Sequence, residues 1–336
     1  MRLRHLTGAA LLLVCCSVLV GCSTSGRTSE SSGDPTPVPV ISTTPEVTKG
    51  SARQTTIVAV GDIVCDPTSP EFDDPTSCRD EDVARLTGRL VRAGAEWFVP
   101  LGDLQYQDGR LEAFQEGYDR SFGRFLSITE PVAGNHEWYS GAEGYFAYFG
   151  DRAGTATRPW RTFVPERGWR VVLLDSDCER VGGCGPESPQ GRWLSRVLVR
   201  SDAPCTMAVW HHPLQSSGDY GGDAATIARA RPLWDIADAG GVDLVLNGHQ
   251  HLYERFAPID GMRQFTVGTG GRGFDEVVDR AARSRVLISQ RYGVLRLTLL
   301  DDGRYAYAFI DTDDEVLDAG LSRCTNEPGP AGREPG

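Results

Sequence analysis

The chain has 336 residues, a formal net charge of −12 and six histidines. Lys49 is its only lysine, which excludes a P-loop lysine, a Schiff-base lysine or a Ser-Lys dyad from everything that follows it. The acidic balance argues against general nucleic-acid binding, so we expect no nucleic-acid partner.

The first 21 residues have the composition of an export signal. Arginines precede an apolar stretch, Leu6 to Gly21, that is too short to span a bilayer comfortably. The stretch runs into Cys22 in a pattern that resembles a bacterial lipoprotein cleavage box, and the alternative is a plain signal peptide with an incidental cysteine. We predict a lipoprotein signal peptide at residues 1–21, acylation of Cys22 and anchoring to the outer face of the cell membrane. Removing this leader takes away two arginines and changes the net charge to −14.

The remaining chain divides by composition into three parts. Residues 22–54 are rich in Ser, Thr, Pro and Gly and are predicted to be a disordered tether. Residues 55–324 number about 270, close to the upper size of one compact domain, and are predicted to be the catalytic domain. Residues 325–336 form a Pro- and Gly-rich tail that we also predict to be disordered.

Hydrophobic periodicity predicts an α/β domain. The predicted strands cover residues 55–60, 97–101, 161–164, 169–175, 206–210, 242–246, 264–267, 286–289, 293–300 and 305–310. The predicted helices cover residues 80–95, 111–125, 144–149, 188–199 and 224–239. The change from strand–helix units to consecutive strands predicts two mixed β-sheets packed together with helices outside.

Six cysteines lie in the predicted domain, an even number in an exported chain. None has the Cys-x-x-Cys spacing of a zinc ribbon. About fifteen connectivities are formally possible. The cost of loop closure favours Cys65–Cys78 and Cys178–Cys184, which leaves Cys205–Cys324.

Polar residues of one chemical kind follow five of the predicted strands or short apolar segments. They are Asp62; Asp103 with Tyr106; Asn135 with His136; His211 with His212; and His249 with His251. Carboxylate, imidazole, amide and phenolate groups suit Zn, Fe or Mn, and seven or eight donors suit two ions that share a carboxylate. Taken singly, each residue has an ordinary explanation as a turn, capping or core residue. Their joint position, which includes every histidine outside the leader, favours one metal site.

Two other chemistries find no support in the chain. The glycine-rich segment 268–273 is followed by neither a lysine nor a helical pattern, so a loop near the cleft is expected rather than a phosphate cradle. A serine hydrolase would need a Gly-x-Ser-x-Gly motif, which the sequence lacks.

The ordered motifs Gly-Asp, Gly-Asp-x-x-Tyr, Gly-Asn-His-Glu, His-His-Pro and Gly-His-x-His resemble the calcineurin-like metallophosphoesterase superfamily. Tyr106 and Glu254-Arg255 resemble its purple acid phosphatase branch. The resemblance runs from residue 55 to about 310 and implies a four-layer α/β/β/α sandwich of two mixed β-sheets flanked by helices. Many members have Asp-x-His in the first motif, whereas this chain has Val64 two residues after Asp62 in place of the histidine. Tyr106 supplies the missing donor, as in the purple branch.

This resemblance implies a phosphoric ester hydrolase that uses a binuclear metal centre and a metal-bound hydroxide for in-line attack on phosphate monoesters. The implied metals are Fe(III) with Fe(II), Zn or Mn. The implied ligands of the first metal are Asp62, Asp103, Tyr106 and His251, and those of the second are Asp103, Asn135, His211 and His249. His136 would contact the phosphoryl group and protonate the leaving oxygen, and His212 would either support the ligands or face the substrate.

Two alternatives stay open on the sequence. A phosphodiesterase or nucleotide hydrolase would use the same metals, and the choice would depend on the loops at residues 137–144 and 216–222. A surface metal-binding lipoprotein without activity is the second alternative, against which the complete set of donors argues. For an enzyme of either kind, the expected partner is a phosphorylated small molecule.

Overall fold

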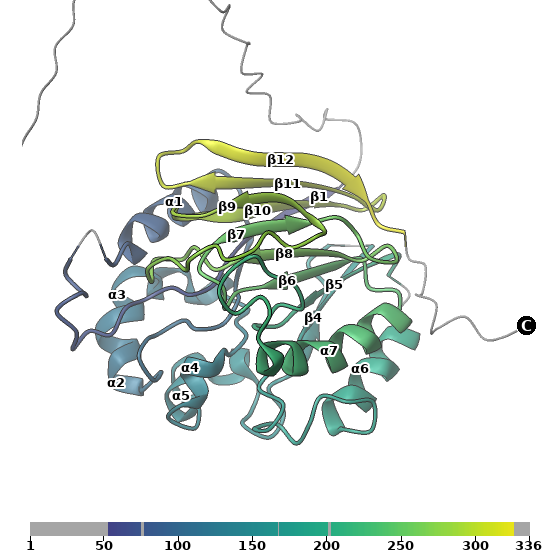
Figure 1. Ribbon diagram of the computed structural model, residues 1–336, viewed down its shortest axis with the longest axis horizontal. Helices are drawn as coiled ribbons and strands as arrows, with labels where there is room; N and C mark the ends of the chain where they lie inside the picture. Colours follow the sequence, from purple (N-terminus) through teal and green to yellow (C-terminus); the bar gives the residue numbers. More distant parts are fainter. Residues whose placement is uncertain (1–52, 75–76, 167, 201–202, 326–336) are drawn as a thin grey trace, which may run out of the picture. The chain divides into compact units, whose positions relative to one another are not determined.

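The computed structural model describes residues 53–74, 77–166, 168–200 and 203–325. The predicted signal peptide, Cys22, the tether up to residue 52 and the tail from residue 326 lie outside these residues. The described part contains two β-sheets stacked on each other, with helices around them (Figure 1). None of its helices is long and apolar enough to cross a membrane.

The first sheet has five strands in the order β12-β11-β10-β1-β2. Its strands are β1 (Gln54–Val60), β2 (Trp97–Pro100), β10 (Gly293–Leu300), β11 (Arg304–Asp311) and β12 (Val316–Arg323). β1 pairs in parallel with β2 and antiparallel with β10, so the sheet is mixed.

The second sheet has seven strands in the order β3-β4-β5-β6-β8-β7-β9. Its strands are β3 (Arg161–Phe163), β4 (Trp169–Leu173), β5 (Cys205–Val209), β6 (Leu244–Asn247), β7 (Tyr253–Phe256), β8 (Arg263–Val267) and β9 (Ser284–Ile288). The central strands β4, β5, β6 and β8 are parallel. β3 pairs antiparallel with β4, β7 pairs antiparallel with β8, and β9 pairs antiparallel with β7.

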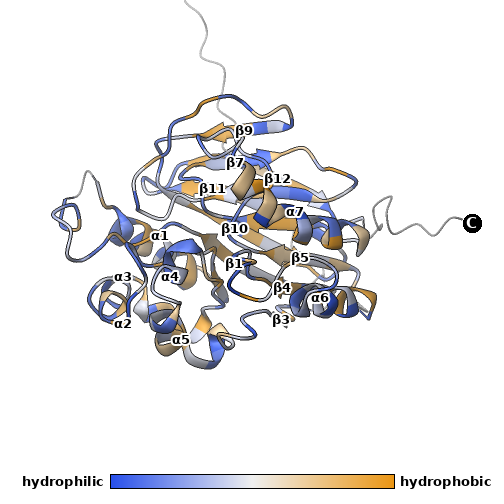
Figure 2. Cartoon of the chain, turned by 60° about the horizontal axis from the view of Figure 1, so that its bottom comes forward, coloured by the Kyte–Doolittle hydropathy of each residue, from blue (hydrophilic) through white to orange (hydrophobic). Residues whose placement is uncertain are grey.

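The core lies between the sheets and beneath the helices. Every residue of β5 and β6 is buried, as expected for parallel strands that are covered on both faces. Figure 2 shows these inner strands as apolar, whereas polar residues gather on the outer faces of the helices. The apolar runs that predicted the strands are therefore the runs that fill the core.

Helices cover both outer faces of the sheet pair. Helix α1 (Asp80–Arg92) contacts β10 of the first sheet, and α6 (Pro189–Val199) packs beside α7 (Ala224–Ala239) at the second (Figure 1). The Asp223 side chain accepts a hydrogen bond of 2.7 Å from Thr226 N–H and so caps α7. The predicted layers of two mixed sheets flanked by helices are confirmed.

The prediction of one continuous α-helix at residues 111–125 is wrong. Residues 111–128 form α2 (Leu111–Ala113), a π-helical turn (Phe114–Tyr118), α3 (Asp119–Ser121) and a 3₁₀ turn (Gly123–Ile128). The buried side chain of Gln105 accepts a hydrogen bond of 2.8 Å from Tyr118 N–H and so replaces a bond within the helix. The remaining short helices are α4 (Asn135–Trp138) and α5 (Glu143–Phe149).

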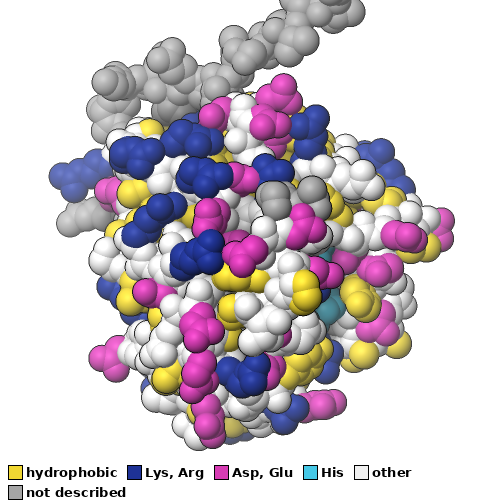
Figure 3. All heavy atoms as spheres, turned by 90° about the vertical axis from the view of Figure 1, so that its left-hand side faces the viewer, with side chains coloured by type: hydrophobic (Ala, Val, Ile, Leu, Met, Phe, Trp, Pro, Cys, Tyr) yellow, Lys and Arg dark blue, Asp and Glu magenta, His cyan; other side chains and the backbone are white. Residues whose placement is uncertain are grey.

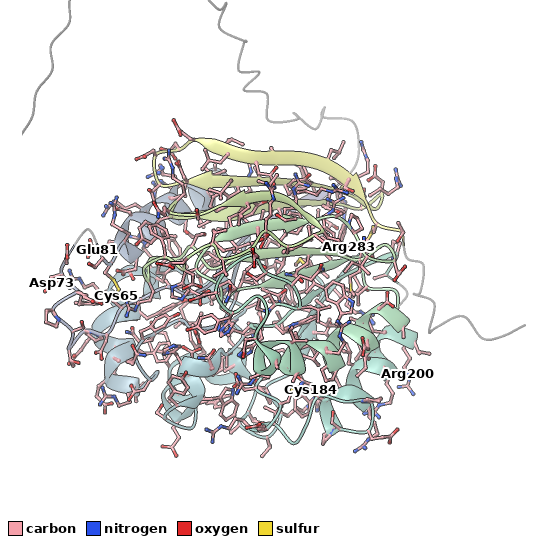
Figure 4. All side chains as sticks on the ribbon, viewed as in Figure 1. Cys65, Asp73, Glu81, Cys184, Arg200 and Arg283 are labelled. Atoms are coloured by element: carbon pink, nitrogen blue, oxygen red, sulfur yellow. A yellow bond between two sulfur atoms is a disulfide. The ribbon has the colours of Figure 1, made fainter. Side chains whose placement is uncertain are left out.

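The three predicted disulfides are present. They join Cys65 to Cys78, Cys178 to Cys184 and Cys205 to Cys324, with Cα–Cα distances of 6.1, 5.1 and 5.7 Å. Figure 4 labels Cys65 at the left of the fold and Cys184 near its lower edge. The bridge to Cys324 ties the end of β12 to the start of β5, and therefore joins the two sheets covalently.

We expect the Cys205–Cys324 bridge to be the most stabilising of the three. Its sequence separation is 119 residues, against 6 for Cys178–Cys184. On the chain-entropy estimate, its loss costs about 5 kcal/mol, against about 2 kcal/mol for the shorter loop. Guanidinium unfolding of the C205A/C324A and C178A/C184A double variants measures both losses. Equal losses would contradict this ranking.

Candidate metal centre

A cleft of about 480 Å³ opens where strands of both sheets end. Asp62 follows β1, Asp103 follows β2, His211 follows β5 and His249 follows β6. Because β1 runs parallel to β2 and β5 runs parallel to β6, their carboxyl ends bring these side chains to one edge. Figure 3 shows histidine atoms in a recess between acidic and hydrophobic side chains.

The backbone at this edge adopts unusual conformations. Asp62, Asp103 and His249 have φ values of 60°, 50° and 70°, in the left-handed region that non-glycine residues seldom occupy. Each costs on the order of 1–3 kcal/mol, which the surrounding contacts must offset. Gly102, with φ 89°, admits no larger residue, because an added Cβ would lie 2.4 Å from His211 Nδ1.

A first group of donors gathers around the Tyr106 hydroxyl. Tyr106 Oη lies 3.1 Å from Asp62 Oδ1, 3.3 Å from Asp103 Oδ2 and 3.0 Å from His251 Nε2. Asp62 Oδ1 is also 3.4 Å from His251 Nε2. Four donor atoms from three separate segments therefore converge on one small buried volume.

A second group gathers on the other side of Asp103. His211 Nε2 lies 3.1 Å from Asp103 Oδ2, and ligand atoms of Asp103, His211 and His249 lie within 4.8 Å of one another. His211 Nδ1 donates to the Leu101 carbonyl at 2.8 Å, so Nε2 is the nitrogen that faces Asp103. His249 Nε2 contacts Thr226 Oγ1 at 3.3 Å, which leaves Nδ1 for the cleft.

Asn135 and His136 reach the cleft from α4. Asn135 Nδ2 donates to Tyr139 Oη at 3.0 Å, while its buried Oδ1 has no hydrogen-bond partner among the described residues. His136 N–H donates to Asp103 Oδ1 at 2.9 Å, and His136 Nδ1 donates to the Gln107 carbonyl at 2.6 Å. The amide oxygen and the second imidazole nitrogen are therefore available to a ligand in the cleft.

Charge pairing perturbs the protonation of these groups. Burial lowers the pKa of His211, but the Asp103 carboxylate outweighs it and raises that pKa to about 10. Burial and the neighbouring His211 lower the pKa of His249 to about 3, which keeps this imidazole neutral. Burial, Asp103 and Asp62 raise the pKa of Tyr106 well above its usual value. A cation among these donors would relieve the crowding of negative charge and favour the deprotonated ligands.

Glu137 fixes the backbone of the site rather than entering the cleft. Its fully buried carboxylate accepts hydrogen bonds of 2.8 to 3.2 Å from the N–H groups of Asp103, Leu104, Gln105 and Gly134. Burial and the nearby Asp103 raise the pKa of Glu137 to about 8, and the N–H donors oppose that rise. The position of Glu137 at the end of the Gly-Asn-His-Glu motif, next to the donors Asn135 and His136, was the sequence feature that could have indicated this role.

The histidines of the His-His-Pro and Gly-His-x-His motifs take different positions. His212 is fully buried, and its Nδ1 contacts Ser176 Oγ at 2.8 Å, which favours the supporting role over the substrate-facing one. His249 and His251 do share the cleft, as their joint position in the sequence predicted. They lie in the loop between β6 and β7, and the positive φ of His249 orients its ring.

The sequence predicted part of the cleft wall. The loops at residues 137–144, 216–222 and 268–273, which were expected near the site, contribute Tyr139, Tyr220 and Arg272. The residues that the sequence did not single out include Asp177, Arg180, Arg229 and Asp275. Asp275 holds His251 by accepting from its backbone N–H at 2.7 Å. Arg229 Nε lies 3.9 Å from Asp177 Oδ1, and Arg272 lies over the Tyr106 ring at 5.5 Å. The residues that were not singled out come from loops and helix faces that have no local motif.

The donor set fits metal ions. Asn135 Oδ1 is buried without a hydrogen-bond partner in the described structure, His211 Nε2 faces Asp103 Oδ2 at 3.1 Å, and further oxygen and nitrogen donors surround Asp103. Two stacked mixed sheets with such a cluster at their carboxyl edge define a class of metal-binding α/β proteins, whose function is set by the site.

Comparison with known proteins identifies the family. The model of the calcineurin-like phosphoesterases matches residues 55–253, which is more than half of the chain. The chain therefore belongs to the calcineurin-like phosphoesterase family, as the motif order predicted.

The similar proteins point to one branch of this family. A probable inactive purple acid phosphatase 1 of Arabidopsis thaliana is 24% identical over 260 residues, covering 64% of this chain and 41% of the relative. Purple acid phosphatase 3 of Arabidopsis thaliana is 35% identical over 78 residues, covering 23% of this chain and 20% of the relative. The chain thus spans about two fifths or less of these relatives.

The fold is similar to that of a purple acid phosphatase from yellow lupin (Lupinus luteus) seeds. The TM-score is 0.64 at 18% identity, covering 80% of this chain and 54% of that one. Together with the sequence matches, this likeness agrees with the predicted purple acid phosphatase-like branch and its α/β sandwich.

We expect Glu137→Gln to destabilise the site and the fold. An amide leaves part of the bonded N–H groups without an acceptor and points two new donors at them, a loss of about 2–4 kcal/mol. Urea unfolding measures this loss against Glu116→Gln, a matched change at an exposed position on the same side of the sheet pair. Equal stability of the two variants would contradict the anchoring role of Glu137.

Proposed function

We propose that the protein is a hydrolase of phosphate monoesters with a binuclear metal centre. The observation that carries the proposal is the position of Asp103 Oδ2, 3.3 Å from Tyr106 Oη on one side and 3.1 Å from His211 Nε2 on the other. One carboxylate oxygen with donors on both sides is the arrangement that two adjacent cations need. Relatives named as purple acid phosphatases support the same activity.

The proposed ligands divide along this shared carboxylate. Asp62, Asp103, Tyr106 and His251 would hold the first ion, and Asp103, Asn135, His211 and His249 the second. The first set is supported by the contacts of Tyr106 Oη with Asp62 and His251, and the second by the clustering of Asp103, His211 and His249. A phenolate among hard oxygen donors favours Fe(III) in the first set, and imidazole-rich donors favour Fe(II), Zn or Mn in the second.

When bound, such a pair of ions would lower the pKa of water and neutralise charge on the phosphoryl oxygens. The chain itself supplies guanidinium groups to the cleft from Arg180 and Arg229. Arg229 is restrained by Asp177, and its side chain is 34% exposed, so it remains accessible to a phosphorylated substrate. We propose that these arginines bind phosphoryl oxygens that the ions do not reach.

His136 is the proposed general acid. The Gln107 carbonyl accepts from its Nδ1–H, which turns Nε2 toward the cleft, and the ring is 14% exposed. An imidazolium held in this way donates the Nε2 proton to the leaving oxygen as the P–O bond breaks. General acid catalysis of this kind contributes roughly 10²- to 10⁴-fold.

We also propose that the protein is exported and anchored to the outer face of the cell membrane through Cys22. The basic and apolar leader supports export, and the Cys22 context supports acylation. The three disulfides of the described domain agree with an oxidising compartment outside the cytosol.

Metal content and substrate choice test the central proposal. We expect two bound transition metal ions per chain by elemental analysis, and turnover of chromogenic phosphate monoesters faster than of the matching diesters. Fewer than one ion per chain with no turnover after metal reconstitution would refute the binuclear centre. Faster cleavage of diesters would favour the phosphodiesterase alternative.

The same iron-loaded protein tests the metal identity and the ligands. A visible charge-transfer band is expected, and Tyr106→Phe should remove it while the fold remains, as judged by circular dichroism. Asp103→Asn should lower metal content to one ion or fewer and nearly abolish turnover. A band that persists in Tyr106→Phe would refute the phenolate ligand.

We expect His136→Ala to slow esters with poor leaving groups more than esters with good ones. An alkoxide leaving group needs a proton in the transition state, so kcat for alkyl esters should fall by about 10²- to 10⁴-fold. A nitrophenolate needs none, so kcat for nitrophenyl esters should fall by only about tenfold. Steady-state kcat values for the two ester types measure this difference. Equal losses on both would remove His136 from the general-acid role.

A further inference from the structure

The cleft wall is unusually aromatic for this chain. Phe, Trp and Tyr make up 9% of the sequence, but five of the twenty lining residues. Two of these, Tyr139 and Tyr220, are the aromatic members of the exposed large hydrophobic side chains in the described part, at 60% and 45% exposure. Exposed rings of this size that gather at one cleft indicate a surface meant for contact.

Both rings are placed by residues of the site itself. The Tyr139 ring packs 4.7 Å from the His136 ring, and its hydroxyl accepts from Asn135. The Tyr220 ring packs 5.2 Å from the His249 ring, centroid to centroid. Each tyrosine therefore uses part of its surface to contact a site histidine and leaves the rest open to solvent.

The position of Tyr139 relates it to one part of the substrate. His136 is the group that would face the leaving oxygen, so the ring beside it borders the path by which the alcohol leaves the cleft. Tyr220 approaches from the segment before α7, on the side of His249, and Phe274 adds a third ring, packed on Tyr292 at 4.1 Å. A volume of about 480 Å³ leaves room for more than a phosphoryl group.

We propose that Tyr139 and Tyr220 bind the alcohol part of the ester by stacking, and that the preferred substrates carry a planar ring close to the ester oxygen. This inference rests on the proposed phosphoesterase function and specifies its substrate class. Stacked aromatic pairs favour centroid distances of 4.5–7 Å. Stacking tolerates different ring types and substituents, so the tyrosines would select for a planar ring and not for one compound.

Benzyl phosphate and ethyl phosphate test the inference, because both release a primary alkoxide and differ mainly by the ring. With the metal-reconstituted full chain, we expect kcat/KM to favour the benzyl ester by about tenfold, mostly through KM. Tyr220→Ala should reduce that ratio by about fivefold, whereas Tyr220→Phe should retain it. Tyr139→Phe keeps the ring but loses the hydrogen bond from Asn135, a proposed metal ligand. A change in the ratio for this variant would therefore reflect the position of Asn135 and not the loss of a stacking ring.

Val199→Ala is the matched control, since Val199 is 87% exposed at the end of α6 and does not line the cleft. It should leave the ratio unchanged. A wild-type ratio near one, or a ratio that Tyr220→Ala does not alter, would overturn the stacking site while phosphatase activity stands.

Binding of two non-hydrolysable probes separates this failure from failure of the proposed function. If neither ester is turned over, calorimetry with benzylphosphonate and ethylphosphonate still measures the preference for a ring. Tighter binding of benzylphosphonate that weakens about fivefold in Tyr220→Ala would support the stacking site without catalysis. Equal binding of both probes would overturn it.

Discussion

The Glu137 carboxylate accepts hydrogen bonds from backbone N–H groups on two separate loops, and the geometry of the site depends on this interaction. The loop after β2 contributes Asp103, Leu104 and Gln105, and the start of α4 contributes Gly134. Two segments whose N–H groups meet at one buried carboxyl group cannot shift independently. Asp103 in the loop after β2 and Asn135 at the start of α4 are therefore held at fixed positions relative to each other.

The second constraint is the closeness of the backbone around Asp103. An added Cβ at Gly134 would lie 2.2 Å from Asp103 Oδ1, so only glycine allows the loops to approach this far. Asp62 and Asp103 have left-handed backbone conformations, and both carboxylates lie beside the Tyr106 hydroxyl. The strain at these residues is offset by hydrogen bonds from His249 N–H to Asp62 and from His136 N–H to Asp103.

Around this rigid centre, the cleft wall is assembled from less constrained segments. Arg180 lies in the loop closed by Cys178–Cys184, Arg229 lies on α7 and Arg272 lies in the glycine-rich loop. Tyr139 and Tyr220 lie in turns. The proposed chemistry therefore belongs to strand ends that the sheets fix, and the proposed choice of substrate belongs to surface loops outside the core.

The sequence by itself determined the order of strands and helices, the donor residues and the cysteine pairs, because each depends on short-range periodicity, on motif spacing or on the cost of closing a short loop. It did not predict the short strand β7, the edge strand β12, which has little apolar patterning, or the π-helical turn at Phe114–Tyr118, which depends on the distant Gln105 side chain. Only the tertiary structure turned His212 inward, brought the arginines and tyrosines to the cleft, and buried Glu137 beneath four N–H groups. Those features join residues tens to more than a hundred positions apart, and such contacts leave no local pattern in the chain.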